Sequence, residues 1–307
     1  MQGDKGDIMQ LNRRNFLKAS AGVAGAAGLA LLKSPDVACA EGMVSRIASD
    51  QDVAMLVDTS KCVSCWWCYA ACKNYNGLPE TIKPEPEQPP ALSSNVWTTL
   101  NTVKIADRWS SRKNACNHCS DAACVRVCPT GALSYNDMGF VQYDKEKCSG
   151  CGYCAEFCPF GVPQMSSSVL NDIAVMDKCT FCIDRVTNGQ QTACAEACPY
   201  GAIKFGQRSQ LVAEGKERAA ELRRDNANAR FYGDDELGLH VMYVLDNKPD
   251  VYNLPEDPEV PAAVEVRDIL QWAGVGLTAA AIVGFGLNYI VAKYSQIKSR
   301  SADNKDE

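Results

Sequence analysis

Cysteine is the residue type whose number and spacing point most directly to chemistry in this sequence of 307 residues. Sixteen of the seventeen cysteines recur in four runs, each with four cysteines close together in the chain. The runs are Cys62, Cys65, Cys68 and Cys72; Cys116, Cys119, Cys124 and Cys128; Cys148, Cys151, Cys154 and Cys158; and Cys179, Cys182, Cys194 and Cys198. Three thiolates from one tight loop can reach three irons of a cubane, and the fourth ligand must come from elsewhere. The repeat therefore predicts four 4Fe-4S clusters bound by these sixteen cysteines.

The third run has the spacing C-x2-C-x2-C-x3-C-P of bacterial ferredoxins without a change, ending at Pro159. The first run keeps the spacing but has Lys73 in place of the proline, whereas the second and fourth lengthen the gap before their third cysteine. We expect a loop in each lengthened gap. Between the second and third runs, residues 133–135 and 140–143 flank turn residues and predict a β-hairpin.

Two other uses of cysteine compete with clusters. Zinc also binds four thiolates, but zinc ribbons draw paired knuckles from separate hairpins, whereas each run here is compact and three of the four end in Cys-Pro. Disulfides are typical of exported proteins, but thiolates already bonded to iron are not free to pair. The sequence favours clusters over both alternatives.

The few histidines and the tryptophans near the runs receive structural interpretations. His118 and His240 are the only histidines, so mixed Cys/His zinc sites and a haem held by two histidines are hard to build. We expect His118, within the second run, to be structural because a Rieske site needs two histidines. Trp66 and Trp67 are expected to shield a cluster from water.

Charge and motifs exclude several function classes. The net charge of -6 and the pI near 5.2 leave no basic footprint for nucleic acid. No dinucleotide-binding glycine run, P-loop or nucleophile elbow is visible in the sequence. The sequence therefore predicts an electron-transfer chain that performs no substrate chemistry of its own.

The N-terminus has the order of an export signal. Arg13 and Arg14 precede Phe-Leu-Lys, a weakly apolar run follows over residues 19–32, and Ala38-Cys39-Ala40 offers a small-residue cleavage site. The paired arginines resemble the twin-arginine signal, which directs folded, cofactor-loaded proteins across the membrane. We expect cleavage after Ala40, which would remove Cys39 with the signal.

A second apolar run, from Ile269 to Ala292, carries no charge and would form a helix about 36 Å long. Trp272 lies near one end and Tyr289 near the other, as aromatic residues at two membrane interfaces would. Acidic residues precede the run and basic residues follow it, which predicts a cytoplasmic C-terminus and a periplasmic body. A buried amphipathic helix is the alternative interpretation of this run.

The chain resembles the four-cluster β subunits of membrane-bound respiratory oxidoreductases, and formate dehydrogenase β subunits most closely, over residues 55–292. The most specific likeness lies in KCTFCIDR at residues 178–185, GAIKFG at 201–206 and HVMYVL at 240–245. The resemblance implies an α+β fold of tandem bacterial-ferredoxin-like modules with one C-terminal transmembrane helix. It departs in one respect, because in many members the catalytic subunit, and not the β subunit, carries the twin-arginine signal.

The resemblance also implies which cysteines share a cluster. The four implied clusters are Cys62, Cys65, Cys68 and Cys198; Cys179, Cys182, Cys194 and Cys72; Cys116, Cys119, Cys124 and Cys158; and Cys148, Cys151, Cys154 and Cys128. The implied partners are a catalytic molybdopterin subunit, with molybdenum or tungsten, and a membrane cytochrome b subunit that reduces quinone. Iron-sulfur subunits of nickel-iron hydrogenases or of other molybdopterin oxidoreductases, which have a similar layout, are the alternative.

The expected domain organisation follows the chain in order. Residues 1–40 form the signal, 41–205 the four-cluster body, 206–267 a docking and linker segment, 268–292 the membrane helix, and 293–307 a cytoplasmic tail. Within the third part we expect a charged surface helix over residues 209–228 and an extended linker over 249–261. The expected location is therefore the inner membrane, with one membrane-spanning helix.

Overall fold

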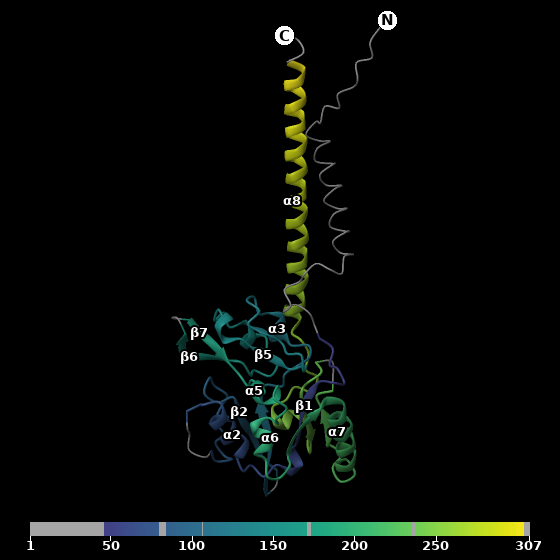
Figure 1. Ribbon diagram of the computed structural model, residues 1–307. Helices are drawn as coiled ribbons and strands as arrows, with labels where there is room; N and C mark the ends of the chain where they lie inside the picture. Colours follow the sequence, from purple (N-terminus) through teal and green to yellow (C-terminus); the bar gives the residue numbers. More distant parts are fainter. Residues whose placement is uncertain (1–45, 80–83, 106, 171–172, 235–236, 304–307) are drawn as a thin grey trace. The chain divides into compact units, whose positions relative to one another are not determined.

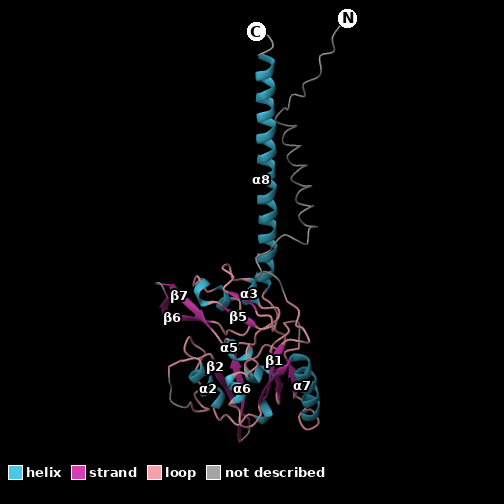
Figure 2. Cartoon of the chain, viewed as in Figure 1, coloured by secondary structure: helices cyan, strands magenta, loops and turns pink. Residues whose placement is uncertain are grey.

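A computed structural model describes residues 46–79, 84–105, 107–170, 173–234 and 237–303 (Figure 1). The described chain divides into a compact body that ends at Glu265 and a helical part from Val266 on. The body contains all sixteen cysteines of the four runs, and short helices in it are joined by loops (Figure 2). The signal segment and Cys39 lie outside the described residues.

The centre of the body is a four-stranded mixed sheet in the order β8-β1-β10-β9. Its strands are β1 (Val53–Asp58), β8 (Ile203–Gln207), β9 (Arg230–Tyr232) and β10 (Val241–Leu245). β1 and β10 pair in parallel with Met55 opposite Val241, and β8 and β9 flank them in antiparallel pairing. β10 is buried along its whole length and is rich in apolar residues, as a central strand covered on both faces requires.

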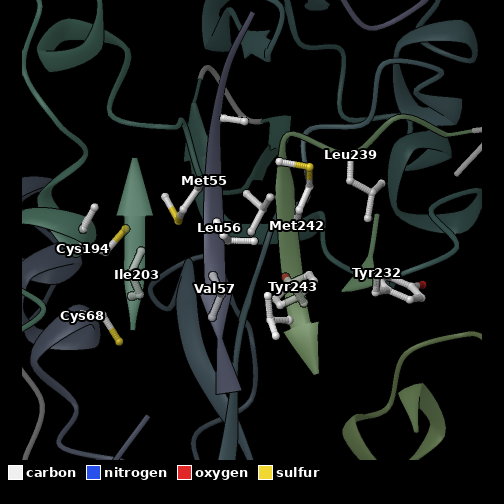
Figure 3. Packing of buried hydrophobic residues seen from close by; sticks show 14 of the residues in the cluster. Met55, Leu56, Val57, Cys68, Cys194, Ile203, Tyr232, Leu239, Met242 and Tyr243 are labelled. Atoms are coloured by element: carbon white, nitrogen blue, oxygen red, sulfur yellow. The ribbon is translucent and has the colours of Figure 1, made fainter. Parts of the chain in front are cut away.

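One face of this sheet is covered by α7 (Arg208–Leu222), which contacts β1, β9 and β10 (Figure 1). The buried face of α7 carries Leu211, Gly215 and Ala219. Cys68 and Cys194 join Ile203 and Met55 in the same apolar cluster as the sheet (Figure 3). The core of the fold therefore extends directly to cysteine side chains.

The segment over residues 206–267, expected to serve docking and to act as a linker, also contributes to the central sheet unit, and α7 forms the charged helix expected within it. α7, β9 and β10 belong to the central sheet unit, and η3 (Pro249–Tyr252) follows them. Tyr252 is fully buried, and its hydroxyl lies 2.6 Å from Ser110 Oγ. Proline and acidic residues predicted an extended linker here, but one buried tyrosine ties the segment to the body.

Three two-stranded hairpins complete the strands of the body. They are β2 (Thr98–Ile105) with β3 (Arg108–Ala115), β4 (Leu133–Tyr135) with β5 (Val141–Tyr143), and β6 (Gln164–Leu170) with β7 (Ile173–Asp177). The predicted hairpin between the second and third runs is confirmed as β4 and β5. The mixture of helices and strands agrees with the predicted α+β class.

Short helices carry the later cysteines of each run. They are α2 (Trp67–Tyr75), α3 (Ala123–Arg126), α4 (Tyr153–Glu156) and α6 (Ala193–Glu196), and α5 (Ile183–Val186) lies inside the fourth run. The third cysteine of every run is the second residue of its helix. The gap before Cys194 was expected to be a loop, but α5 occupies part of it.

The residue after the fourth cysteine explains why one of these helices is longer. Proline at positions 129, 159 and 199 cannot continue a helix, and α3, α4 and α6 each end before it. Lys73 replaces the proline in the first run, and α2 runs on to Tyr75. Lys73 also anchors the next loop, because its Nζ donates to the carbonyl oxygens of Pro79 and Asn95 at 2.8 and 2.9 Å.

The strand-to-run connection is repeated in the body. η1 (Thr59–Lys61) precedes Cys62 and η2 (Lys145–Lys147) precedes Cys148. Each begins after an aspartate, Asp58 or Asp144, whose carboxylate accepts from a backbone N–H in the first turn. The same local interactions thus deliver the chain into the first and third runs.

The C-terminal helix α8 (Ala262–Asp303) is longer than the predicted membrane helix. Over residues 262–297 it is apolar and long enough to span a bilayer, with a mean hydropathy of 1.8 in its most apolar window. None of that window is buried in protein, which disfavours the buried-helix alternative.

Gly215 generates a test of how α7 packs on the sheet. A Cβ at this position would lie 2.4 Å from the Phe231 ring and 3.1 Å from Leu56 Cδ1. We predict that Gly215→Leu destabilises the body by about 1 to 3 kcal/mol through overpacking. Ala220→Leu, at an exposed position of the same helix, is the matched control. The measurement is the temperature at which the iron-sulfur absorbance is lost, and equal effects of the two variants would contradict the packing.

Candidate iron-sulfur centres

Each cysteine run bends through left-handed backbone conformations. Positive φ angles occur at Ser64 and Trp66 in the first run, His118 in the second, and Phe181 and Cys182 in the fourth. In the third run the corresponding positions are Gly150 and Gly152, which adopt such angles without steric cost. Non-glycine residues in this region are strained and cluster at functional sites. The local strain therefore marks the cysteine loops, independently of the cysteine spacing.

The cysteines gather in groups that combine different runs. We call these groups sets 1 to 4. Set 1 is Cys62, Cys65, Cys68 and Cys198, and set 2 is Cys72, Cys179, Cys182 and Cys194. Set 3 is Cys116, Cys119, Cys124 and Cys158, and set 4 is Cys128, Cys148, Cys151 and Cys154. The cysteines of set 1 line one cavity, those of set 2 a second, and those of set 4 a third.

In set 3, the effects of thiols on one another's pKa show which cysteines are neighbours. Burial raises the pKa of the Cys124 thiol, and negative charge on Cys116 and Cys158 raises it further. Cys119 and Cys124 both act on the hydroxyl of Tyr135, whose pKa is raised first by burial. The fold therefore brings the cysteines of sets 1, 2 and 4 to three cavities, and in set 3 it places Cys124 near Cys116 and Cys158.

Burial is the main influence on the thiols, because a thiolate is poorly solvated inside the protein. It raises the pKa of Cys62 to about 11, with Cys65 and Cys198 adding to the rise. It raises the pKa of Cys72, Cys154 and Cys182 to about 12, again with thiols of the same set as neighbours. A thiol binds iron as a thiolate, so iron bound here must displace protons from these sulfurs.

The geometry bears on the zinc and disulfide alternatives. All sixteen cysteines of the sets are free of disulfide bonds. Within the described ranges, no three His, Cys, Asp or Glu side chains close on one point as ligands of a single metal ion would. A tetrahedral zinc site needs its sulfurs about 2.3 Å from one ion, whereas a cubane spreads its thiolates around a larger body.

Neighbouring thiols also show which sets are adjacent. The charge of Cys194 in set 2 raises the pKa of Cys68 in set 1, after burial. Cys116 of set 3 acts in the same way on Cys179 of set 2, and Cys154 of set 4 acts on Cys124 of set 3. The sets therefore follow one another in the order 1, 2, 3, 4.

Two buried donors without acceptors line the cavity of set 1. Within the described chain, Trp66 Nε1 and Lys113 Nζ have no hydrogen-bond partner, and both residues line this cavity. Buried donors normally have acceptors, so an orphan donor indicates a missing group. Cluster sulfurs accept such hydrogen bonds. The residues present therefore fit a thiolate-bound cluster in this cavity.

The two tryptophans differ in how they cover set 1. Both line its cavity, but Trp66 is 2% exposed whereas Trp67 is 62% exposed and so covers it only in part. His118 is fully buried as a structural residue: its Nδ1 lies 3.1 Å from the Val141 carbonyl oxygen and its ring packs 4.8 Å from that of Phe181.

Sequence reasoning missed two buried lysines beside the sets. Lys178 Nζ donates to the carbonyl oxygens of Val141 and Cys179 at 3.1 and 3.0 Å, and its charge lowers the pKa of thiols in set 3. Lys113 comes from β3, a hairpin strand. Lys178 adjoins Cys179 and was visible in the motif, whereas no sequence signal connects Lys113 to set 1.

Two segments of the chain match known protein families. Residues 108–208 match the 4Fe-4S dicluster domain family, and residues 10–30 match the twin-arginine translocation pathway signal sequence. The predicted signal is therefore confirmed. The fold and the match together define an iron-sulfur protein with a 4Fe-4S dicluster domain.

Similar proteins identify the family more closely. The formate dehydrogenase-O iron-sulfur subunit of Escherichia coli (strain K12) is 36% identical, over 80% of this chain and 83% of its own length. The Hydrogenase-2 operon protein HybA of Escherichia coli O157:H7 is 36% identical over 68% of this chain and 67% of its own. The thiosulfate reductase electron transfer subunit PhsB of Salmonella typhi is 40% identical over 50% and 74%. The chain belongs to the family of iron-sulfur electron-transfer subunits that includes those of formate dehydrogenases, which confirms the predicted non-catalytic class.

Cysteines of the first and last runs line a common cavity, so we predict that they bind the same cluster. Cys62→Ala and Cys198→Ala should remove the same signal from the low-temperature EPR spectrum of the reduced protein, because both thiols line one cavity. Cys194→Ala should remove a different signal, because Cys194 lines the cavity of Cys72. Loss of the same signal from Cys194→Ala and Cys198→Ala would contradict this pairing.

Proposed function

We propose that this chain holds four 4Fe-4S clusters, one in each set, and relays electrons from a catalytic subunit to a membrane subunit. The observation that carries the proposal is that cysteines from distant runs line common cavities in sets 1, 2 and 4. A bound 4Fe-4S cluster supplies one-electron oxidation and reduction. The protein supplies the thiols, the apolar cover that excludes water, and the spatial order of the sites.

The side of set 1 suits the entry of electrons. An open groove beside Cys65 is lined by Trp67, Tyr69 and Lys73 on α2. Trp67 exposes a large aromatic surface there, and exposed tryptophans are typical centres of protein interfaces. We assign this groove to the catalytic subunit. The family favours a molybdenum or tungsten formate dehydrogenase as that subunit.

The side of sets 3 and 4 suits the exit of electrons. Val264, in the first turn of α8, is fully buried against Ala123 and Val127, with Phe157 beside them. Each of these three residues directly precedes a cysteine: Cys124, Cys128 or Cys158. Val264, which belongs to the body, thus packs next to residues of these sets. We assign this side to a membrane cytochrome b subunit that reduces quinone.

The proposed location is the inner membrane, with α8 as its single span in contact with lipid. The twin-arginine signal supports export of the folded, cluster-loaded body to the periplasm. Acidic residues before the apolar run and Lys293 after it support a cytoplasmic C-terminus. Cleavage of the signal after Ala40 and a cytoplasmic tail over residues 293–307 remain part of the proposal.

A nickel-iron hydrogenase is the second candidate for the catalytic partner. The similarity to the Hydrogenase-2 operon protein HybA covers two thirds of this chain, and this chain, like the resembled hydrogenase-associated subunits, has its own twin-arginine signal. The metal of the partner distinguishes the two candidates.

Elemental analysis of the complex tests the proposal. The complex is purified gently in detergent through this subunit, and iron, zinc, molybdenum, tungsten and nickel are counted together. We expect about sixteen irons from this chain, at about four per cluster, and no stoichiometric zinc. Molybdenum or tungsten supports a formate dehydrogenase partner and nickel a hydrogenase partner. Four zinc ions in place of iron would reject the four-cluster assignment.

Trp67 provides a test of the entry side. We predict that Trp67→Glu reduces co-purification of the catalytic subunit at least about tenfold, because a charge replaces an exposed aromatic anchor. Iron is counted in the same preparation, because Trp67 also lines the cavity of set 1, and the comparison is made on protein that keeps its full iron content. Ala220→Glu, an exposed position on α7 outside the groove, is the control. Unchanged co-purification with Trp67→Glu would place the catalytic subunit elsewhere.

A further inference from the structure

β3 buries four consecutive polar side chains, and only one of them lacks a hydrogen-bond partner. Ser110 bonds to Tyr252, Ser111 lies 2.6 Å from Ser64 Oγ, and Arg112 donates from Nε to the Tyr252 carbonyl oxygen at 3.0 Å. Lys113 is 1% exposed, and its Nζ finds no acceptor in the described chain. The strand is therefore built to satisfy its buried polar groups, with Lys113 as the exception.

A buried ammonium without a partner is unfavourable, because the charge has lost its water and gained nothing in return. No carboxylate pairs with Lys113 among the described residues. By contrast, the buried ammonium of Lys178 donates to two carbonyl oxygens. Lys113 is thus an unpaired cation that requires negative charge from another source.

That source lies in the thiols near the Lys113 side chain. Lys113 lines the cavity of set 1, together with Cys62 and Cys198. Burial acts to lower its pKa, but Cys194, Cys179, Tyr243 and Cys68 act to raise it, and the pKa rises as a result. Cys194 and Cys179 belong to set 2, and Cys68 to set 1. The ammonium therefore lines the cavity of set 1 and is within electrostatic range of thiols of set 2.

We infer that Lys113 is a positioning charge for electron transfer: its buried ammonium lines the cavity of set 1 and raises the reduction potentials of the clusters in sets 1 and 2. The inference rests on the proposed function. A cubane with four thiolates is anionic and becomes more so on reduction, so a nearby fixed cation favours the reduced form. Burial leaves this attraction weakly screened by salt. The charge makes the first two sites along the chain better electron acceptors.

The test uses the full chain in its purified complex. Iron and sulfide are counted first, and the potentials of the clusters are then measured by EPR during a redox titration. We expect Lys113→Met to lower the equilibrium constant for reducing the clusters of sets 1 and 2 at least tenfold, about 59 mV for a one-electron couple. Set 4 should change least. Lys104→Met, an exposed lysine on the partner strand β2, is the matched control and should shift no potential.

Two further variants separate charge from packing. Lys113→Arg keeps the positive charge and should hold both potentials close to those of the unchanged protein. Lys113→Gln is a second neutral variant and should shift them downward as Lys113→Met does. If both neutral variants lose iron while Lys113→Arg retains it, the charge is needed to hold the clusters, which supports the assignment.

Other outcomes overturn the inference. Fully loaded Lys113→Met with unchanged potentials would show that the ammonium does not act on the clusters, while the four-cluster function would stand. Loss of iron from Lys113→Arg as well as from both neutral variants would show a packing role only. If the protein without any substitution contained fewer than about four irons per set, the proposed function itself would be rejected, and the inference with it.

Discussion

The body of this protein depends on one constraint: a compact run supplies three thiols to a site, and the fourth must come from another run. The constraint joins segments that are far apart in the chain. Cys72 meets Cys179 and Cys194, and Cys198 meets Cys62. The parallel pairing of β1 with β10 has the same long-range character, because the whole body lies between the two strands. The cysteine sets and the sheet therefore both join early and late segments of the body.

This constraint places thiolates in the protein interior, away from water, and other groups of the site must stabilise their charge. Thiolates need positive charge and N–H donors once they are removed from water. The strained loops at Trp66, His118 and Phe181 turn the backbone around the sulfurs, and buried lysines bring cations close to them. A core made only of apolar residues would oppose the ionised form of these thiols. The buried polar residues of β3 are thus part of the same solution as the cysteines.

The sequence predicted the local parts of this arrangement well. The cysteine spacing located all four loops, and the turn residues located the hairpin of β4 and β5, because both features are encoded within a few adjacent residues. The pairing of the sets came from the family resemblance and could not come from spacing alone. Lys113 was not predicted because its relation to set 1 exists only after the hairpin of β2 and β3 folds onto the first run.

The segment after β8 shows why long-range packing was misjudged. Its charge and proline content indicated a surface helix and a linker, yet α7 hides a narrow face of small residues against the sheet, where Gly215 lies against Phe231 and Leu56. Such a face gives a weak apolar signal because glycine and alanine contribute little hydrophobicity. Tyr252 and Leu254 likewise anchor their segment as buried side chains, and the Tyr252 carbonyl oxygen accepts from Arg112. No periodic pattern in the sequence predicts these contacts.

The two ends of the row of sets differ in how they meet their surroundings. At set 1 the α2 helix continues past Cys72 because Lys73 replaces a proline, and the longer helix carries the open groove. At sets 3 and 4 proline ends the helices early, and the residues just before three of the cysteines pack on Val264 at the start of α8. The longer helix α2 at the first end and the packing on Val264 at the other thus distinguish the two ends. In the proposed function, this asymmetry gives a repeated cysteine motif a direction.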